Sequence, residues 1–324
     1  YMTNILITGS AGFIGFNLSK DLLNKKGYKI IGIDNFNDYY DVNLKKKRLK
    51  QLSKSNNFKF YKADLTEKNK IEKIFKNNKI DFIFHFAAQA GVRHSIDHPR
   101  KYIDSNILGF YNLIENVKKH NIKRLFYASS SSVYGENKNF PLNEKENIFP
   151  KNIYALSKKI NEEIGFIFNK YYNTKLTGLR FFTVYGEWGR PDMMMMKYID
   201  CFYKKKLFYL NNYGNHSRDF TYIGDVVNIL YLLLKKQKKL KDFDLLNICS
   251  NQPINLKKII SFMKKKKINP KIKKISLQKA DILKTHGDNQ KLLKIIKYNK
   301  FSNWQNSVEK TIIWYQKNMI KKSK

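Results

Sequence analysis

Residues 4–15 read NILITGSAGFIG, and this stretch decides the fold. Its first five residues form a short apolar run with β-branched side chains, which predicts a buried strand. Residues 17–23 have the apolar spacing that is typical of a helix. Between strand and helix, Gly9, Gly12 and Gly15 allow the backbone to approach a pyrophosphate, whose charge is stabilised at the helix N-terminus. The stretch therefore predicts the phosphate-binding turn of a dinucleotide site.

A second apolar strand is predicted at residues 28–33, and it ends at Asp34. An acid about 20 residues beyond the glycines, at a strand end, can hold both ribose hydroxyls of an adenosine. The same carboxylate would repel a 2′-phosphate, so the sequence favours NAD over NADP as cofactor. The alternative is a tight turn followed by an acid that caps a helix. The order of strand, glycines, helix, strand and acid favours the nucleotide site.

Strands and helices alternate from residue 28 to about residue 180. Further strands are predicted at residues 58–61, 80–85, 124–128 and 175–180. Such alternation is typical of a parallel, doubly wound sheet, so the predicted fold class is α/β with a Rossmann sheet.

The pattern loosens beyond about residue 186. Predicted strands lie at residues 207–210 and 243–248, and predicted helices at about 194–205, 225–236, 255–265 and 305–318. We therefore expect an NAD-binding Rossmann domain at residues 1–185. A smaller α/β domain that binds the substrate is expected at residues 186–324, with some chain crossing back to the first domain.

The residues best suited to chemistry lie in two short segments. Residues 128–135 read ASSSSVYG and follow the strand at 124–128, and Tyr154 lies four residues before Lys158. Positions four apart share one face of a helix, so the ammonium can lower the pKa of the phenol from its ordinary value of about 10. A phenolate beside a serine hydroxyl can take the proton of an alcohol, and a dinucleotide bound nearby would accept the hydride.

The composition argues against several classes of protein. The formal net charge is +37, but only seven of the 63 basic residues are arginine, and the lysines are scattered among Asn, Ile, Phe and Tyr, so no nucleic-acid partner is expected. The two cysteines show no pairing pattern and the six histidines show no metal-ligand spacing, so no metal is expected. No apolar run reaches the ~18 residues of a membrane span, and no basic leader is present, so we expect a cytoplasmic protein without a membrane partner.

These motifs together resemble the extended short-chain dehydrogenase/reductases, and among them the UDP-glucuronate 4-epimerases. The pair Tyr154 and Lys158 is common to the superfamily, whereas residues 89–93 (QAGVR), 180–186 (RFFTVYG) and 189–192 (GRPD) favour the uronate epimerases. The resemblance spans nearly the whole chain. The matching segments are residues 9–15, 34–40, 87–93, 129–135, 154–158, 180–186, 189–193 and 218–223.

The resemblance implies a mechanism in which UDP-glucuronate is converted to UDP-galacturonate. Tyr154 would take the proton of the sugar 4-hydroxyl while the C4 hydride passes to NAD⁺. Lys158 would hold the nicotinamide ribose and keep Tyr154 ionised, and Ser130 would form a hydrogen bond to the 4-oxygen. The 4-keto sugar would then turn over and take the hydride back on its other face.

The resemblance also implies which residues bind cofactor and substrate. The expected NAD contacts are Gly9, Gly12, Phe13, Ile14, Gly15, Asp34, Asn35, Asp64, Leu65, Ala87, Ala88, Asn106, Ser129, Tyr154, Lys158 and Phe182. The expected substrate contacts are Arg93, Ser130, Ser131, Ser132, Thr183, Arg190, Arg218 and Asp281.

Within this substrate set, Arg218 corresponds to a diphosphate clamp and Asp281 to an acid that holds the uridine ribose. Ser131, Ser132 and Thr183 fall on the carboxylate side, with Arg190 close to them in sequence. A 4-keto uronic acid is a β-keto acid that can lose CO₂, so its carboxylate must be held, and hydroxyls and a cation are suitable anchors. For Arg93, Arg190 and Arg218 the alternative is a structural ion pair.

Other functions remain open at this point. The same scaffold could serve a UDP-glucose 4-epimerase, a UDP-glucuronate decarboxylase or a 4,6-dehydratase, although a dehydratase would want an acid pair just before Tyr134, where this chain has Ser131 and Ser132. A non-catalytic basic protein that binds nucleic acid is a more distant alternative. The long helices expected at about 98–119 and 152–172 are candidates for a homodimer interface, and a role in the core is the alternative.

Overall fold

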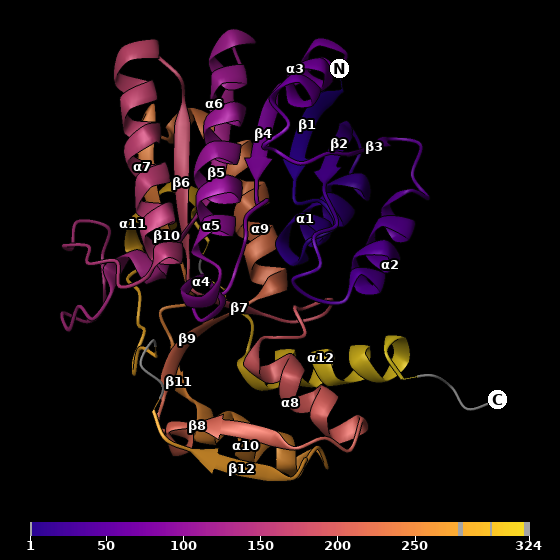
Figure 1. Cartoon of the computed structure of the whole chain (residues 1–324), viewed down its shortest axis with the longest axis vertical. Helices are drawn as coiled ribbons and strands as arrows, with labels where there is room; N and C mark the ends of the chain where they lie inside the picture. Colours follow the sequence, from indigo (N-terminus) through magenta and orange to yellow (C-terminus); the bar gives the residue numbers. More distant parts are fainter. Residues whose placement is uncertain (1, 278–280, 299, 321–324) are drawn as a thin grey trace.

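A seven-stranded parallel sheet forms the centre of the molecule, shown in Figure 1. The computed structural model describes residues 2–277, 281–298 and 300–320. The strands of this sheet are β1 (Thr3–Thr8), β2 (Tyr28–Asp34), β3 (Phe58–Lys62), β4 (Phe82–His85), β5 (Arg124–Ser130), β6 (Leu176–Phe181) and β10 (Phe243–Ile248). Their spatial order is β10-β6-β5-β4-β1-β2-β3, so the strand order reverses between β1 and β4. Open α/β sheets bind ligands at such a reversal, beyond the carboxyl ends of the strands. The predicted doubly wound α/β fold is confirmed.

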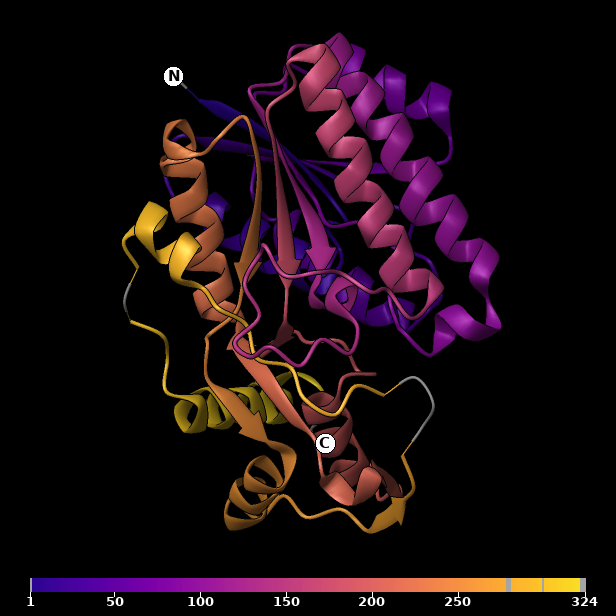
Figure 2. The same ribbon diagram turned by 90° about the vertical axis from the view of Figure 1, so that its left-hand side faces the viewer.

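Helices cover both faces of this sheet, as Figure 2 shows. One layer contains α1 (Phe13–Leu23), α9 (Ile223–Lys235) and α11 (Gln290–Ile296). The opposite layer contains α3 (Lys68–Lys76), α6 (Gly109–Lys119) and α7 (Ile153–Tyr172). Because both faces are covered, the inner strands bury side chains on both sides, and Ile5, Leu6 and Ile7 of β1 are all fully buried.

The helix expected at about 98–119 is present, but it changes its hydrogen-bonding pattern along its length. The chain is helical without a gap through α5 (Pro99–Tyr102), a π-helical segment at Ile103–Leu108 and then α6. A separate short helix, α4 (His94–Asp97), precedes it. A π segment inserts an extra residue into a helical turn, and such segments are frequent at functional sites.

The smaller part of the molecule lies beyond the carboxyl ends of the parallel strands (Figure 1). It contains a three-stranded sheet of β11 (Pro253–Asn255), β9 (Ser217–Tyr222) and β7 (Thr183–Tyr185), and a pair formed by β12 (Ile272–Ile275) and β8 (Phe208–Asn211). Its helices are α8 (Met194–Tyr203), α10 (Leu256–Lys265) and α12 (Trp304–Asn318). Short 3₁₀ turns lie at Ser131–Tyr134, Asn212–Gly214 and Gln237–Lys239. Side chains from all three helices share one apolar core with β8 and β9.

The chain after residue 186 returns to the large sheet. The strand predicted at residues 243–248 is β10, which pairs in parallel with β6 at the edge of that sheet. Helices α9 and α11 cover the same sheet. The boundary at residues 185 and 186 stays a prediction. Among the described residues, no helix has the length and apolar character needed to cross a membrane.

Candidate active site

A cavity of about 740 Å³ lies where the carboxyl ends of the parallel strands face the smaller sheets. Its lining combines the glycine turn, the serine cluster (Ser129–Ser132) at the end of β5 and the start of α7 with residues from β7, β8 and β9. Every predicted site residue except Asn106 lines this cavity. The glycine turn, which is expected to bind the dinucleotide, and the proton-transfer pair, Tyr154 and Lys158, therefore border the same cavity.

The glycine turn leaves no room for side chains. Gly9 has a φ of +69°, and a Cβ at this residue would lie 2.8 Å from the backbone nitrogen of Ala87. The backbone N–H of Gly12 donates to the carbonyl of Gly9 at 2.8 Å. A Cβ at Gly15 would collide with the same carbonyl. The bare backbone at the start of α1 is the cradle that a pyrophosphate requires.

Asp34 is fixed at the end of β2 by two backbone donors. Its Oδ2 accepts from the N–H of Ala11 at 3.1 Å and its Oδ1 from the N–H of Phe36 at 2.9 Å. Burial raises the pKa of this carboxyl, while these hydrogen bonds and the nearby Lys45 and Arg48 oppose the rise. An oriented carboxylate at this place fits the ribose of an adenine dinucleotide.

The rest of the expected adenosine end lies beside Asp34. The amide of Asn35 donates to Asp64 Oδ2 at 2.6 Å, and both residues line the cavity together with Leu65. Phe13, Ile14, Ala87, Ala88 and Phe182 line the same cavity.

Helix α7 presents the proton-transfer pair. The side chain of Asn152 caps the helix by accepting from the N–H of Ala155 at 2.9 Å, which places Tyr154 in the first turn and Lys158 one turn later. Lys158 is 2% exposed, and its ammonium donates to the carbonyl of Ala128 at 2.9 Å. Burial lowers the pKa of Lys158 to about 8. The amine is therefore held against the end of β5, on the helix face that carries Tyr154.

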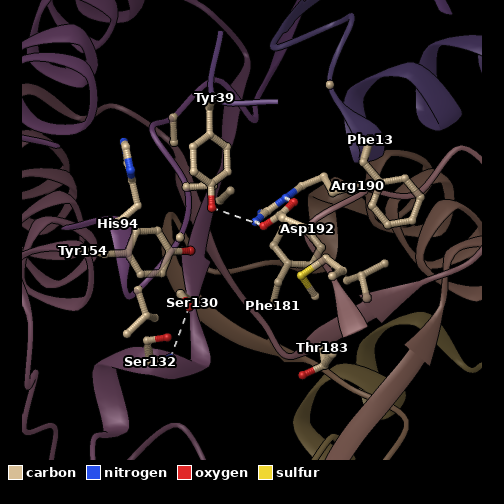
Figure 3. Close-up of a pocket in the computed structure, with 18 of the residues that line it drawn as sticks. Phe13, Tyr39, His94, Ser130, Ser132, Tyr154, Phe181, Thr183, Arg190 and Asp192 are labelled. Carbon is tan, nitrogen blue, oxygen red and sulfur yellow. Dashed lines mark hydrogen bonds and ion pairs between the residues drawn. The ribbon is translucent and has the colours of Figure 1, made fainter. Parts of the chain in front are cut away.

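The serine cluster faces this pair. Ser130 Oγ accepts from the N–H of Ser132 at 3.1 Å, which leaves its own O–H free to donate. Figure 3 shows the Tyr154 hydroxyl pointing into the space that Ser130 and Ser132 border. Ser131 and Thr183 line the same cavity. A hydroxyl donor and a phenol that meet in one cavity can exchange a proton with a bound alcohol.

Ser129 has a different environment from its neighbours. Its hydroxyl donates to Glu162 Oε1 at 2.5 Å, and Arg180 binds both oxygens of that carboxylate, at 2.8 and 2.7 Å. The Glu162 and Arg180 side chains are 4% and 3% exposed. The hydroxyl of Ser129 therefore already has a hydrogen-bond partner. This hydrogen bond connects the end of β5 to α7. The ion pair of Glu162 and Arg180 was not predicted from the sequence. The position of Glu162, four residues after Lys158 in the same helix, could have indicated that it lies near the site.

Asn106 does not line the cavity, but its side chain is hydrogen-bonded to the loop after β4 and to α7. It lies in the π segment, where its Oδ1 accepts from the N–H of Gln89 at 2.7 Å. Its Nδ2 donates to the Gln89 carbonyl at 3.1 Å and to Ser157 Oγ at 3.0 Å. Asn106 is fully buried, so any effect that it has on a cofactor passes through the loop after β4 and through α7.

Arg93 and Asp281, which were expected to contact substrate separately, form an ion pair. Arg93 Nη2 lies 2.7 and 2.8 Å from the two Asp281 oxygens. The buried His216 lies 3.7 Å from the same carboxylate. Arg218 Nη1 donates to the carbonyls of Ser217 and Leu283, both at 3.0 Å. Burial lowers the pKa of Arg218 to about 10, which leaves it charged at neutral pH.

Arg190 also has a protein partner. Its Nε and Nη2 donate to Asp192 at 3.0 and 2.5 Å, and the hydroxyl of Tyr39 donates to Asp192 Oδ2 at 3.1 Å (Figure 3). All three residues line the cavity. Tyr39 and Asp192 were not predicted as site residues, although both fall within the segments that carry the resemblance. Among the described residues, no group of three His, Cys, Asp or Glu side chains could hold a metal ion.

Comparison with known proteins agrees with this geometry. The family model described as "NAD dependent epimerase/dehydratase family" matches residues 5–249. Protein CapI of Staphylococcus aureus is 40% identical over 329 residues, which cover 96% of this chain and 98% of that protein. The UDP-glucuronate 4-epimerase of Thermodesulfobacterium geofontis is 36% identical, with 97% of this chain and 96% of that protein covered.

A solved structure gives the same result in three dimensions. The UDP-glucuronic acid 4-epimerase of Bacillus cereus, in complex with UDP-glucuronic acid and NAD, superposes with a TM-score of 0.91. It is 27% identical, and the match covers 97% of this chain and 99% of that one. The predicted resemblance and the predicted NAD cofactor are confirmed. The chain belongs to the NAD dependent epimerase/dehydratase family.

Proposed function

We propose that this protein interconverts UDP-glucuronate and UDP-galacturonate by epimerisation at C4, with NAD as its cofactor. One observation carries the proposal: a single cavity joins a dinucleotide cradle to Tyr154, Lys158 and the serine cluster. The relatives named UDP-glucuronate 4-epimerase, and the related structure that contains UDP-glucuronic acid and NAD, support the choice of substrate.

The lining residues fit the cofactor. The turn of Gly9, Gly12 and Gly15 has the bare backbone that a pyrophosphate requires, and Asp34 has free lone pairs for ribose hydroxyls. When bound, NAD⁺ supplies a hydride acceptor at the sugar C4 and later returns the hydride. The remaining residues proposed to contact it are Phe13, Ile14, Asn35, Asp64, Leu65, Ala87, Ala88, Ser129, Tyr154, Lys158 and Phe182, with Asn106 acting indirectly.

Tyr154 and Ser130 then handle the proton. Tyr154 takes the proton of the 4-hydroxyl as C4 is oxidised, and it gives the proton back when C4 is reduced. Ser130 donates a hydrogen bond to the 4-oxygen, because its own oxygen already accepts from the N–H of Ser132. The positive charge of Lys158, one helical turn from Tyr154, favours negative charge on the tyrosine oxygen.

The substrate's two ends require different partners. At the sugar end, Ser131, Ser132, Thr183 and Arg190 hold the carboxylate, which keeps the 4-keto acid from losing CO₂. At the nucleotide end, Arg218 takes the diphosphate, and Arg93 and Asp281 lie where the uridine ribose is expected. Their mutual ion pair would then open or turn toward the ligand when substrate binds.

Product analysis tests this proposal. The purified protein with NAD⁺ and UDP-glucuronate is expected to yield UDP-galacturonate, detected by NMR. Interconversion of UDP-glucose and UDP-galactose with UDP-glucuronate left unchanged would contradict it. Release of CO₂ from UDP-glucuronate would instead identify a decarboxylase.

We also propose a homodimer and the two-domain division at residues 185 and 186, with β10, α9 and α11 crossing back. Apolar side chains exposed on α6, on α7 and at the end of the π-helical segment before α6 support the dimer. We call this surface the α6/α7 face, and its residues are Leu108, Tyr111, Leu156, Ile167 and Tyr171.

A further inference from the structure

Arg190 uses only part of its guanidinium to bind Asp192. The donors are Nε, at 3.0 Å from Oδ1, and Nη2, at 2.5 Å from Oδ2, so one edge of the group is engaged. A guanidinium has five N–H groups, and Asp192 takes two of them. The three others include both hydrogens of Nη1. Arg190 therefore keeps donors for a second anion while it remains paired.

Tyr39 contacts both members of this pair. It lies in the loop that follows β2, and its hydroxyl donates to Asp192 Oδ2 at 3.1 Å. The Arg190 guanidinium carbon lies 5.7 Å from the centre of the Tyr39 ring, which is within the range of a cation–π contact. Figure 3 shows the hydroxyl of Tyr39 directed at Asp192. The donating hydroxyl and the ring together restrict both members of the pair.

The protonation states support a fixed arrangement. Burial, together with the charge of Asp192, raises the pKa of Tyr39 to about 12, so its hydroxyl stays a donor. Burial opposes ionisation of Asp192, but the guanidinium of Arg190 and the Tyr39 hydroxyl lower the pKa of this carboxyl below its ordinary value. Both charges of the pair are therefore present at neutral pH.

We propose that Asp192 and Tyr39 are positioning residues that orient Arg190, so that its free donors take the carboxylate of the uronate substrate. This inference rests on the proposed function. A bidentate arginine gives directional recognition of a carboxylate only when its plane is fixed. Asp192 and Tyr39 fix that plane, so they should contribute to the choice of a uronate over a neutral sugar.

Equilibrium binding tests the proposal in a Tyr154→Phe background, in which turnover is expected to be about 10²–10⁴-fold slower. Calorimetry on the NAD-loaded protein measures the affinity for UDP-glucuronate, UDP-glucose and UDP. Asp192→Asn and Tyr39→Phe are each expected to weaken binding of UDP-glucuronate, by about tenfold for Asp192→Asn, because a charge-assisted hydrogen bond is lost or misaligned. Binding of UDP-glucose and UDP is expected to stay within about twofold.

A double-mutant cycle separates positioning from a structural effect. If Asp192 acts through Arg190, adding Asp192→Asn to Arg190→Gln should change the affinity for UDP-glucuronate no further. A matched control exists in α8, where Asp200 accepts from the Tyr315 hydroxyl at 2.5 Å and from Lys204 at 2.7 Å, outside the cavity lining. Asp200→Asn and Tyr315→Phe should leave all three affinities unchanged.

Three outcomes would overturn the inference while leaving the proposed function intact. The first is that the Asp192→Asn protein binds UDP-glucuronate as tightly as its parent, or more tightly, which would make Asp192 a competitor of the substrate. The second is an equal loss for UDP and UDP-glucose. The third is an additive effect in the cycle. Failure of the wild-type protein to convert UDP-glucuronate would instead contradict the proposed function.

Discussion

At the scale of single residues, Tyr154 is the group on which the chemistry depends. Tyr154→Phe removes the hydroxyl and keeps the ring, so binding should change little. Removing a general base typically costs about 10²–10⁴-fold in rate. We expect kcat for UDP-glucuronate epimerisation to fall by that amount, measured by NMR of the product. Turnover at the wild-type rate would contradict every catalytic role assigned here.

Lys158 gives a prediction about stability. Burial lowers its pKa to about 8, below the ordinary value of a lysine, 10.5. Between these values the unfolded chain binds more protons at this residue than the folded chain, so its contribution makes the free energy of unfolding rise with pH. Below pH 8 both states are protonated, and the full cost of burying the charge applies.

Lys158→Met should therefore stabilise the cofactor-free protein at pH 7, by up to about 3 kcal/mol. The difference in free energy of unfolding between the variant and the wild type should shrink as pH approaches 10. Urea unfolding at pH 7 and pH 9.5 measures both values. A difference that does not depend on pH would show that the buried amine does not titrate as described.

Most of the candidate site could be predicted from sequence, because its residues lie in local motifs. Gly9, Asp34 and Tyr154 each sit at a fixed place relative to a strand end or helix start. Tyr39 and Asp192 could not be found in this way. They are 153 positions apart, and their contact exists only once the two halves of the cavity face each other.

At the scale of elements, α2 (Val42–Leu52) shows why a helix can escape prediction. Its inward face carries Lys45 and Arg48, which are 5% and 0% exposed, so the usual apolar period is interrupted. The terminal nitrogens of Arg48 donate to the carbonyls of Ala11 (2.9 Å) and Trp188 (2.5 Å). It thereby joins the glycine turn to the segment before α8.

The buried pair between α7 and β6 gives a second stability prediction. Glu162→Gln leaves the Arg180 guanidinium buried without a full countercharge, and breaking such a pair typically costs about 3–5 kcal/mol. We expect a loss of that size in the free energy of unfolding, measured by chemical denaturation. The exposed neighbour Glu163 is the control, and Glu163→Gln should change the free energy by less than about 0.5 kcal/mol. Equal effects of the two substitutions would contradict a special role for the pair.

At the scale of the whole molecule, the strand at residues 243–248 shows what pattern alone leaves undecided. An apolar run with β-branched residues predicts a strand but not its partner. In the structure this strand pairs with β6, more than 60 positions earlier, because β6 offers an open edge of the large sheet. Tertiary contacts therefore decide which segments after residue 186 join the large sheet and which join the smaller part.

The α6/α7 face gives a prediction about assembly. Helices α6 and α7 lie side by side (Figure 2). The several large apolar side chains exposed on this face are unusual in a monomer, and such patches mark interaction sites. A two-fold axis across this face would bury the same residues of both copies. Light scattering of the wild-type protein at about 10 μM should therefore give the mass of a dimer, because a stable interface has a dissociation constant below this concentration.

Charges placed on this face should separate the copies. The double substitution Tyr111→Glu with Ile167→Glu puts four carboxylates at the proposed interface, and repulsion with lost apolar burial should yield a monomer that is still folded. Ile313 in α12 is the control, because it is a comparably exposed aliphatic residue on a different helix. Ile313→Glu should leave the mass unchanged. A wild-type mass of one chain at this concentration would contradict the proposed homodimer. A double variant that stays dimeric would show that the interface lies on another face.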